Sequence, residues 1–238
     1  MELILHTACF QLYKLSNIIN FQTIRNMTIK TFTFNPFQEN TYLIYDETGE
    51  AVLIDAGCII DYEKKQLKNF IEENKLTLKL ILNTHLHLDH QFGNKFVSET
   101  YGLTPQAHKE DEFLLENVVA QAQSFGLKLP DQSVQPIGHY IADNEEVKFG
   151  NTVLKALHVP GHSPGSLAFY SEKDGVVIVG DVLFRGSIGR TDLPKGDYAT
   201  LITSITKKLL TLPDSTVVYC GHGPTTTIGE EKKNNPYL

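Results

Sequence analysis

The 238-residue sequence contains only three cysteines, Cys9, Cys58 and Cys220, which are too few for a disulfide framework. This scarcity favours a reducing compartment, so we expect a cytoplasmic protein. The sequence also lacks a clean apolar run of membrane-spanning length, because its apolar N-terminal stretch is interrupted by His6, Lys14 and several amides. We therefore expect no membrane partner.

Positive charge is scarce as well. The chain has 21 Lys and Arg residues against 28 Asp and Glu residues, which gives a formal net charge of −7. This balance argues against a broad nucleic-acid-binding surface, so no nucleic-acid partner is expected. No glycine-rich dinucleotide fingerprint follows a strand-like segment, and no motif for a Ser or Cys nucleophile is present. The composition agrees with a soluble enzyme that acts on a small molecule.

Residues 1–26 are interpreted as an N-terminal extension that need not be native. Glu2 stands where a secretory signal peptide would carry positive charge, and no small-residue cleavage site follows. The single arginine, Arg25, gives little support for a mitochondrial address. Met27 opens an alternating strand-like segment and is a candidate for the biological start, so residues 27–238 are expected to form one domain.

Alternating apolar segments and turn residues predict a chain rich in strands. Strands are expected at residues 28–34, 41–45, 51–55, 79–83, 104–107, 152–158, 167–170, 176–179 and 216–219. Helices are expected at residues 62–74, 94–101, 111–125 and 197–210. Runs of strands broken by single helices predict an α/β fold in which two sheets pack face to face with helices outside, a four-layer αββα sandwich.

The most informative segment is a short polar run that directly follows an apolar strand-like segment. It places three imidazoles and one carboxylate in a single turn, at His85, His87, Asp89 and His90. Neutral imidazole and carboxylate are ligands that zinc, iron and manganese accept. His85 and His87 are two residues apart, so in an extended segment both project to the same side and can bind one ion. Asp89 and His90 follow at an offset that suits a second ion.

Three further ligand-type residues stand where strand-like segments meet turns. His162 lies in the run Val-Pro-Gly-His-Ser-Pro-Gly, in which glycine and proline force a tight loop. Asp181 ends the apolar segment 176–180, and His222 follows the apolar segment 217–220 and a glycine. One metal centre built on loops above a sheet explains all of these segments together.

With these motifs, the chain resembles the hydrolases of the metallo-β-lactamase superfamily, and most of all their glyoxalase II branch. The matching landmarks follow the family's order, at residues 53–57, 84–90, 161–165, 180–181 and 221–223. The resemblance implies the metallo-β-lactamase fold and two divalent metal ions, with zinc expected first and iron or manganese next. It places one ion on His85, His87 and His162 and a second on Asp89, His90 and His222, with Asp181 as the bridge.

Two more residues take roles from the resemblance. Asp55 ends the strand-like segment 51–54, where a sheet should not bury an acid without a reason, and it is expected to orient a metal ligand from behind. Arg190 is the counterpart of the basic residue that contacts glutathione in glyoxalase II enzymes. The alternative is that Arg190 pairs with Asp192 and only fixes the loop. His108, His139 and His158 lack matching partners and are interpreted as surface or core residues.

The ligand set implies hydrolysis by a hydroxide that the two ions activate. Asp89 is expected to orient this hydroxide while it binds metal, which makes it the catalytic candidate. The expected substrate is a thioester such as S-lactoylglutathione. The sequence ends soon after His222, without the C-terminal helical region by which glyoxalase II enzymes hold glutathione, so another thioester, an ester or a lactone is an alternative substrate.

Other activities share this skeleton. A persulfide dioxygenase would use one iron on His85, His162 and Asp181, and metal analysis with oxygen consumption separates it from a hydrolase. A β-lactamase is disfavoured, because its common dinuclear class has a cysteine at the position of Asp181. A non-catalytic binding module would be expected to have lost ligands, whereas all seven positions are filled here.

Overall fold

Two six-stranded sheets form the centre of the molecule. The computed structural model describes residues 27–116, 118–127, 129 and 134–238, so the expected extension 1–26 lies outside the described residues. The first sheet has the strand order β1-β2-β3-β4-β5-β6, and the second has the order β14-β13-β10-β9-β8-β7. A small hairpin of β11 (Leu183–Phe184) and β12 (Ser187–Ile188) stands apart from both.

The first sheet begins as an antiparallel meander and continues with parallel strands. Its strands are β1 (Met27–Phe34), β2 (Glu39–Asp46), β3 (Glu50–Ile54), β4 (Thr77–Leu82), β5 (Pro105–Ala107) and β6 (His139–Tyr140). β1, β2 and β3 pair antiparallel, whereas β4, β5 and β6 are added parallel to β3. The loops after β3, β4 and β5 therefore begin at the same end of the sheet, where the carboxyl ends of these strands lie.

The second sheet is antiparallel except for one central pair. Its strands are β7 (Glu146–Phe149), β8 (Thr152–His158), β9 (Leu167–Ser171), β10 (Val176–Gly180), β13 (Val217–Cys220) and β14 (Thr226–Thr227). β10 and β13 pair parallel. The residues that follow them, Asp181 and His222, consequently emerge at the same end of the sheet.

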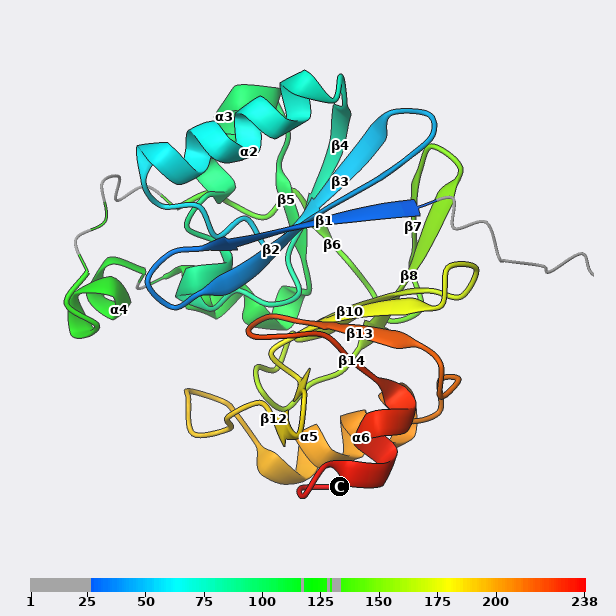
Figure 1. Cartoon of the computed structure of the whole chain (residues 1–238). Coiled ribbons are helices and arrows are strands. Elements are labelled where there is room, and N and C mark those ends of the chain that lie inside the picture. The colour runs from blue at the N-terminus through cyan, green and yellow to red at the C-terminus, as the bar shows by residue number, and fades with distance from the viewer. Residues whose placement is uncertain (1–26, 117, 128, 130–133) are drawn as a thin grey trace, which may run out of the picture.

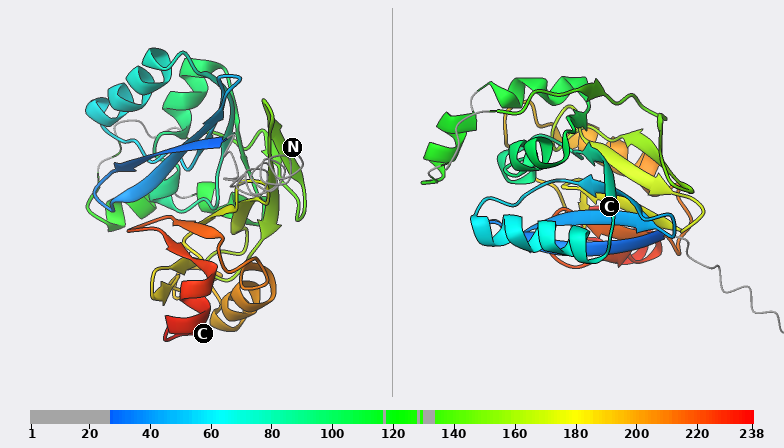
Figure 2. Two further views of the ribbon diagram at one scale, coloured as in Figure 1. Left: turned by 45° about the vertical axis from the view of Figure 1, so that its right-hand side comes forward. Right: turned by 90° about the horizontal axis from the view of Figure 1, so that it is seen from above.

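Helices cover the outer face of each sheet, so the expected αββα sandwich is confirmed (Figure 1). The outer layers consist of α2 (Asp61–Glu73) and α3 (Asn94–Tyr101) on the first sheet, and α5 (Tyr198–Ser204) and α6 (Ile228–Asn234) on the second. A further helix, α4 (Val118–Ser124), projects at the periphery (Figure 2). Among the described residues, no helix is both long and apolar enough to span a bilayer.

Strand alternation separates three layers of apolar packing. In β10, Val176 and Ile178 belong to the cluster between the sheets, whereas Val177 and Val179 pack with Leu201 of α5 on the outer side. β3 divides in the same way, with Val52 and Ile54 inside and Ala51 and Leu53 beneath α2 and α3. Successive side chains of a strand point to opposite faces, so a strand that is apolar throughout is covered on both sides.

Each strand expected from the sequence is present, with ends within two residues of the prediction. The helix expected at residues 111–125 is instead a 3-10 helix, Lys109–Leu115, followed by α4. The expected helix 197–210 changes from α5 to a π-helical turn at Ile205–Leu209. The prediction missed β6, β7, the β11–β12 hairpin, β14 and α6, which are too short to produce a clear periodic pattern.

Asp46 ties the ends of the two sheets together. Its Oδ2 accepts hydrogen bonds from the Asn151 backbone N–H (2.7 Å) and from the Thr152 hydroxyl (2.9 Å), more than a hundred residues along the chain. Its Oδ1 accepts from the Thr48 N–H at 3.0 Å. Burial alone raises the pKa of Asp46, but these hydrogen bonds outweigh burial and lower the pKa below its ordinary value.

Replacing Asp46 with alanine is expected to lower the free energy of unfolding by about 1–3 kcal/mol, because the buried Thr152 hydroxyl and two backbone N–H groups lose their acceptor. Since the native pKa of Asp46 is lowered, this contribution is present above the unfolded-state pKa of about 3.9 and is lost as pH falls through the native value. Urea unfolding at neutral pH and below pH 4 measures both effects.

Glu73→Ala, which removes an exposed carboxylate from α2, is the matched control for this experiment. A destabilisation by Asp46→Ala that is the same at both pH values would contradict the role of the carboxylate.

Candidate metal centre

Three histidine nitrogens converge at the first group of expected ligands. The Nε2 atom of His162 lies 3.2 Å from Nε2 of His85 and 2.9 Å from Nδ1 of His87. Nitrogens bound to a tetrahedral zinc ion at its usual bond length lie roughly 3.4 Å apart. The loop after β4 supplies His85 and His87, and the loop after β8 supplies His162, so the three have the spacing of ligands to one ion.

The second group lies beside the first. His222 Nε2 is 3.3 Å from Oδ2 of Asp89, and His90 Nε2 is 3.8 Å from the same oxygen. One ligand atom from each of these three residues lies within 4.8 Å of the other two. Their rings and carboxylate form a compact set of donors of the kind that binds a divalent ion.

Asp181 stands between the two groups. Its Oδ2 lies 3.7 Å from His162 Nε2 and 3.4 Å from His222 Nε2. Its Oδ1 lies 3.5 Å from His90 Nε2. The structure therefore brings all seven expected ligands together, with one carboxylate that reaches both groups.

Unpaired buried atoms show that the site suits cations. His90 Nε2 and Asp181 Oδ1 are buried and have no hydrogen-bond partner. A buried polar atom without a partner costs free energy that a bound cation can offset. Burial, reinforced by neighbouring histidines, lowers the pKa of His85 well below its ordinary value and that of His87 to about 3. Both rings are thus neutral, which is the form that binds a metal.

The carboxylates give the second group a preference for positive charge. Burial lowers the pKa of His222, but Asp181 and Asp89 outweigh burial and raise it to about 10. The same carboxylates, with Asp55, raise the pKa of His90 well above its ordinary value despite complete burial. A divalent cation satisfies this negative field and competes with the protons for the same nitrogens.

Hydrogen bonds behind the histidines fix the direction of their rings. The carbonyl oxygens of Arg190 and Phe37 lie 2.8 Å from His162 Nδ1 and 3.0 Å from His222 Nδ1, respectively. Each ring can therefore donate from Nδ1 and present Nε2 toward the centre, which is the usual arrangement behind a metal-bound histidine.

Asp55 occupies the corresponding position behind His90. Its Oδ2 lies 3.0 Å from His90 Nδ1 and accepts a hydrogen bond from the Thr84 hydroxyl at 2.6 Å, and its Oδ1 accepts one from the Thr84 backbone N–H at 2.7 Å. Its backbone φ of +54° is unusual for a residue other than glycine, and such conformations cluster at functional sites. The carboxylate is thus held between a candidate ligand and the loop that carries it.

Gly221 permits the close approach of β13 to the site. A Cβ atom at this position would lie 2.1 Å from Asp181 Oδ1 and 2.9 Å from Cε1 of His90. Any side chain would displace the carboxylate between the two groups. The site therefore requires a glycine before His222 on steric grounds.

Sequence reasoning missed Asp111 as part of this arrangement. This buried carboxylate accepts from the backbone N–H of Leu86 (3.2 Å), the Ser163 hydroxyl (2.8 Å) and the backbone N–H of Gly165 (2.6 Å). It thereby joins the two loops that carry His85 and His162. No local sequence signal identifies this role, because its partners are 25 to 54 residues away.

The centre opens into a pocket of about 460 Å³. Segments 111–125 and 182–192 contribute Leu114, Phe125 and Arg190 to its lining. Phe37, Leu193 and Pro194 complete the apolar wall, and none of them has a signal in the sequence that marks it as a pocket residue. His87, Asp89, His162, Asp181 and His222 form the polar face of the same pocket. Its size lies within the ordinary range of small-molecule sites.

Arg190 lies at the rim of this pocket with its guanidinium already paired. Its Nε and Nη2 atoms donate to the two carboxylate oxygens of Asp192, at 2.7 and 2.6 Å. Both side chains are more than half exposed, and exposed pairs of this kind contribute little to stability. The structure thus contains the loop-fixing contact while it also places Arg190 at the pocket.

Comparison with known proteins gives the class. The sequence profile of the Metallo-beta-lactamase superfamily matches residues 34–222, so the chain belongs to that superfamily of metal-dependent hydrolases. It is 42% identical over 217 residues to hydroxyacylglutathione hydrolase GloC of Haemophilus influenzae, covering 89% of this chain and 98% of that protein.

Solved structures agree with this assignment. The structure of BLEG-1 B3 metallo-beta-lactamase has a TM-score of 0.81 at 37% identity, over 89% of this chain and 99% of that one. The structure of TTHA1623 in a di-iron-bound form has a TM-score of 0.78 at 39% identity, over 88% of this chain and 100% of that one.

Protein purified without chelators is expected to contain close to two divalent transition-metal ions per chain, because seven ligands exceed the needs of one tetrahedral site. Asp181→Ala is expected to lower the occupancy of both positions, since it removes the carboxylate that reaches both groups. Elemental analysis by mass spectrometry measures the stoichiometry. His139→Ala, an exposed histidine outside the site, is the control. One ion or fewer in the wild type would contradict the expectation.

Asp111→Ala is expected to weaken zinc binding about 10–100-fold, because the loops of His85 and His162 lose their common anchor. Asp111→Asn keeps one acceptor oxygen and is expected to restore part of the affinity. Competition with a chromophoric chelator measures both. Glu116→Ala, an exposed carboxylate beyond the same 3-10 helix, should bind zinc like the wild type. Equal affinity for wild type and Asp111→Ala would refute the anchoring role.

Proposed function

We propose that the protein is a thioesterase of the glyoxalase II type that hydrolyses S-lactoylglutathione or a closely related thioester. The observation that carries this proposal is a complete set of seven His and Asp ligands that opens into a small-molecule pocket. The similarity to hydroxyacylglutathione hydrolase GloC, which extends over nearly the full length of that relative, supports the substrate class.

The polar face of the pocket has the groups that such a hydrolysis needs. Two divalent cations on these ligands would supply Lewis-acid activation of water and polarisation of the scissile carbonyl. The Oδ2 atoms of Asp89 and Asp181 lie 3.3 and 3.4 Å from His222 Nε2, and both residues line the pocket. We assign Asp89 the role of orienting the attacking water and accepting its proton. A thiol has an ordinary pKa of about 8.5, so a thiolate leaves without a strong general acid.

The described cysteines do not offer a competing nucleophile. Burial raises the pKa of Cys58 to about 12, and burial together with Glu231 raises that of Cys220 to about 12. Both side chains are buried in apolar clusters. A thiol that stays protonated at neutral pH is a poor nucleophile, which favours direct attack by water.

The apolar wall and the rim of the pocket suit different parts of a thioester substrate. Phe37 and Phe125 meet edge to face with ring centroids 5.5 Å apart, and Leu114 and Leu193 extend this surface beside the metal ligands. We assign the wall to the apolar parts of the thioester and Arg190 to an anionic group at the opening. A guanidinium has five N–H donors, so its pairing with Asp192 leaves donors for a substrate carboxylate.

Arg190→Ala is expected to lower kcat/KM for S-lactoylglutathione about 10–100-fold, because one charge-assisted hydrogen bond contributes about 1–3 kcal/mol. The kcat/KM for a neutral thioester is expected to change little. The variant keeps the backbone carbonyl that faces His162. Asp192→Asn, which frees the guanidinium, is expected to retain or raise activity on the anionic substrate. Steady-state kinetics of the three proteins on both substrates measures these effects.

If Arg190 only fixes the loop, the outcome differs. Arg190→Ala and Asp192→Asn would then lose activity together and equally on neutral and anionic thioesters.

Asp181 disfavours β-lactam hydrolysis, but the structural similarity to a B3 metallo-β-lactamase keeps this reaction as the second candidate. A chromogenic cephalosporin and a lactone are therefore assayed beside the two thioesters. Oxygen consumption with glutathione persulfide tests the dioxygenase alternative, and the di-iron form of TTHA1623 makes iron analysis part of that test. Thioester turnover that is absent while any of these reactions is fast would overturn the proposal.

A further inference from the structure

A second cluster of potential ligands lies away from the seven residues of the candidate metal centre. His108 directly follows β5, Glu110 lies in the first turn of the 3-10 helix Lys109–Leu115, and His158 ends β8. The imidazole rings of His108 and His158 stack with their centroids 4.0 Å apart and their planes 14° apart. The sequence suggested two histidines without matching partners, but the fold brings them into contact.

Two oxygen atoms that can bind a metal lie close to His158. His158 Nε2 lies 2.8 Å from the carbonyl oxygen of Pro164 and 4.0 Å from Oε2 of Glu110. One ligand atom each from His108, Glu110 and His158 lies within 4.8 Å of the other two. Two imidazoles, a carboxylate and a backbone carbonyl are a donor set that zinc and its neighbours in the first transition series accept.

We propose that His108, Glu110 and His158 form a separate binding site for a divalent transition-metal ion of the zinc class, with the Pro164 carbonyl as an additional oxygen ligand. Metal binding at His158 Nε2 replaces the proton that this nitrogen shares with the Pro164 carbonyl. The Glu110 carboxylate closes the remaining distance by a side-chain rotation, because it is more than half exposed and therefore free to move. The lone pairs of the two stacked rings lie in nearly parallel planes, so one ring also turns out of the stack when both bind the ion.

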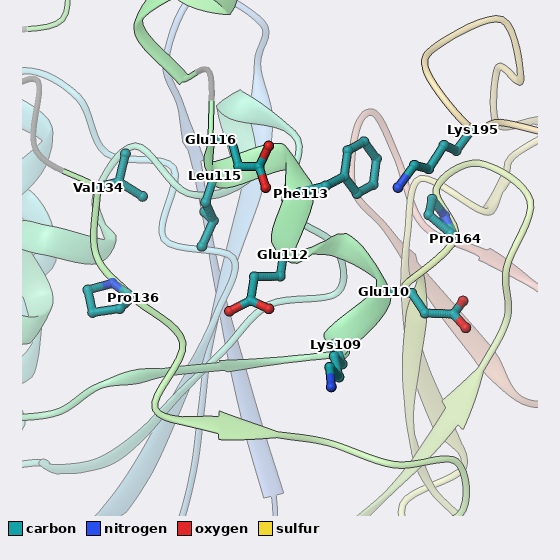
Figure 3. Close-up of a pocket in the computed structure, with 10 residues that line it drawn as sticks. All are labelled: Lys109, Glu110, Glu112, Phe113, Leu115, Glu116, Val134, Pro136, Pro164 and Lys195. Atoms are coloured by element: carbon teal, nitrogen blue, oxygen red, sulfur yellow. The ribbon is translucent and has the colours of Figure 1, made fainter.

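The state of the rings and access from solvent both support the site. Burial, and then the neighbouring His158, lower the pKa of His108, so its ring is neutral at pH 7. The Glu110 N–H donates to His108 Nδ1 at 3.3 Å, a long hydrogen bond that an ion on this nitrogen would replace. Glu110 and Pro164 lie at one end of an open groove of about 900 Å³, through which an ion can enter (Figure 3).

An ion at this place would join three segments that also position the candidate metal centre. Pro164 is two residues from His162, and Glu110 is next to Asp111, which anchors the same loop. Binding would therefore brace the loop of His162 and the 3-10 helix against the end of β8. A ligand that binds only the folded protein raises its stability in proportion to the logarithm of the ligand concentration above its dissociation constant.

The test uses the full chain, with zinc alone as the probe. Wild-type protein and the double variant His108→Gln/His158→Gln are dialysed to equilibrium against the same excess of zinc, and bound metal is measured by mass spectrometry. The double variant is expected to bind one ion fewer per chain. His139→Gln, an exposed histidine that pairs with Glu145 outside the cluster, is expected to match the wild type.

A second variant and a thermal measurement distinguish loss of the ion from a folding defect of the double variant. Glu110→Gln leaves both rings in place and changes only an exposed side chain. It is expected to weaken the binding of the same ion at least tenfold. Zinc beyond the first two equivalents should raise the melting temperature of the wild type but not of the double variant.

Equal numbers of bound ions in wild type and double variant, at any total, would overturn the proposal. This result is distinguishable from failure of the proposed hydrolase, because the comparison measures a difference of one ion that does not depend on what the Asp181 centre binds or hydrolyses.

Discussion

The buried carboxylate of Asp181 is the contact on which the candidate centre depends. Burial alone raises its pKa, but His90, His222 and other imidazoles around it hold that pKa well below the ordinary value. The group is therefore an anion in the interior, surrounded by histidine nitrogens that partly lack partners. Cations between these groups offset the cost of burying them, whereas removal of any one member leaves the others uncompensated.

Residues behind the ligands supply the rigidity that this arrangement needs. Asp55 holds His90 and Thr84 from a strained backbone position, and Asp111 joins the loops of His85 and His162. Gly221 keeps space for the Asp181 carboxylate. The parallel pair β10–β13 brings Asp181 and His222 out at the same end of one sheet, and the loops of the other sheet meet them there. The sandwich thus fixes the site through strand ends, while the surrounding loops are available to determine the substrate.

Local pattern was sufficient to predict the sandwich and to single out the histidines and acids that the fold brings together at strand ends, whereas their role as metal ligands stays a prediction. Strands such as β10 are apolar at every position because helices cover one face and the other sheet covers the opposite face, and a turn with an acid or histidine follows each. Long-range contacts could not be predicted in this way. Asp111 has the sequence of an ordinary helical acid, and the stacking of His108 on His158 depends on how β5 and β8 end beside each other. Phe37 lines the pocket from a turn with no chemical signal of its own.

Anomalous diffraction from crystals of the metal-loaded protein tests the two-ion centre most directly. Data collected at the absorption edge of the bound metal locate each ion independently of the protein model. We predict one peak among His85, His87 and His162 and a second among Asp89, His90 and His222, with the Asp181 carboxylate between them. A single peak in this region at full metal loading, or two peaks that Asp181 does not touch, would contradict the account.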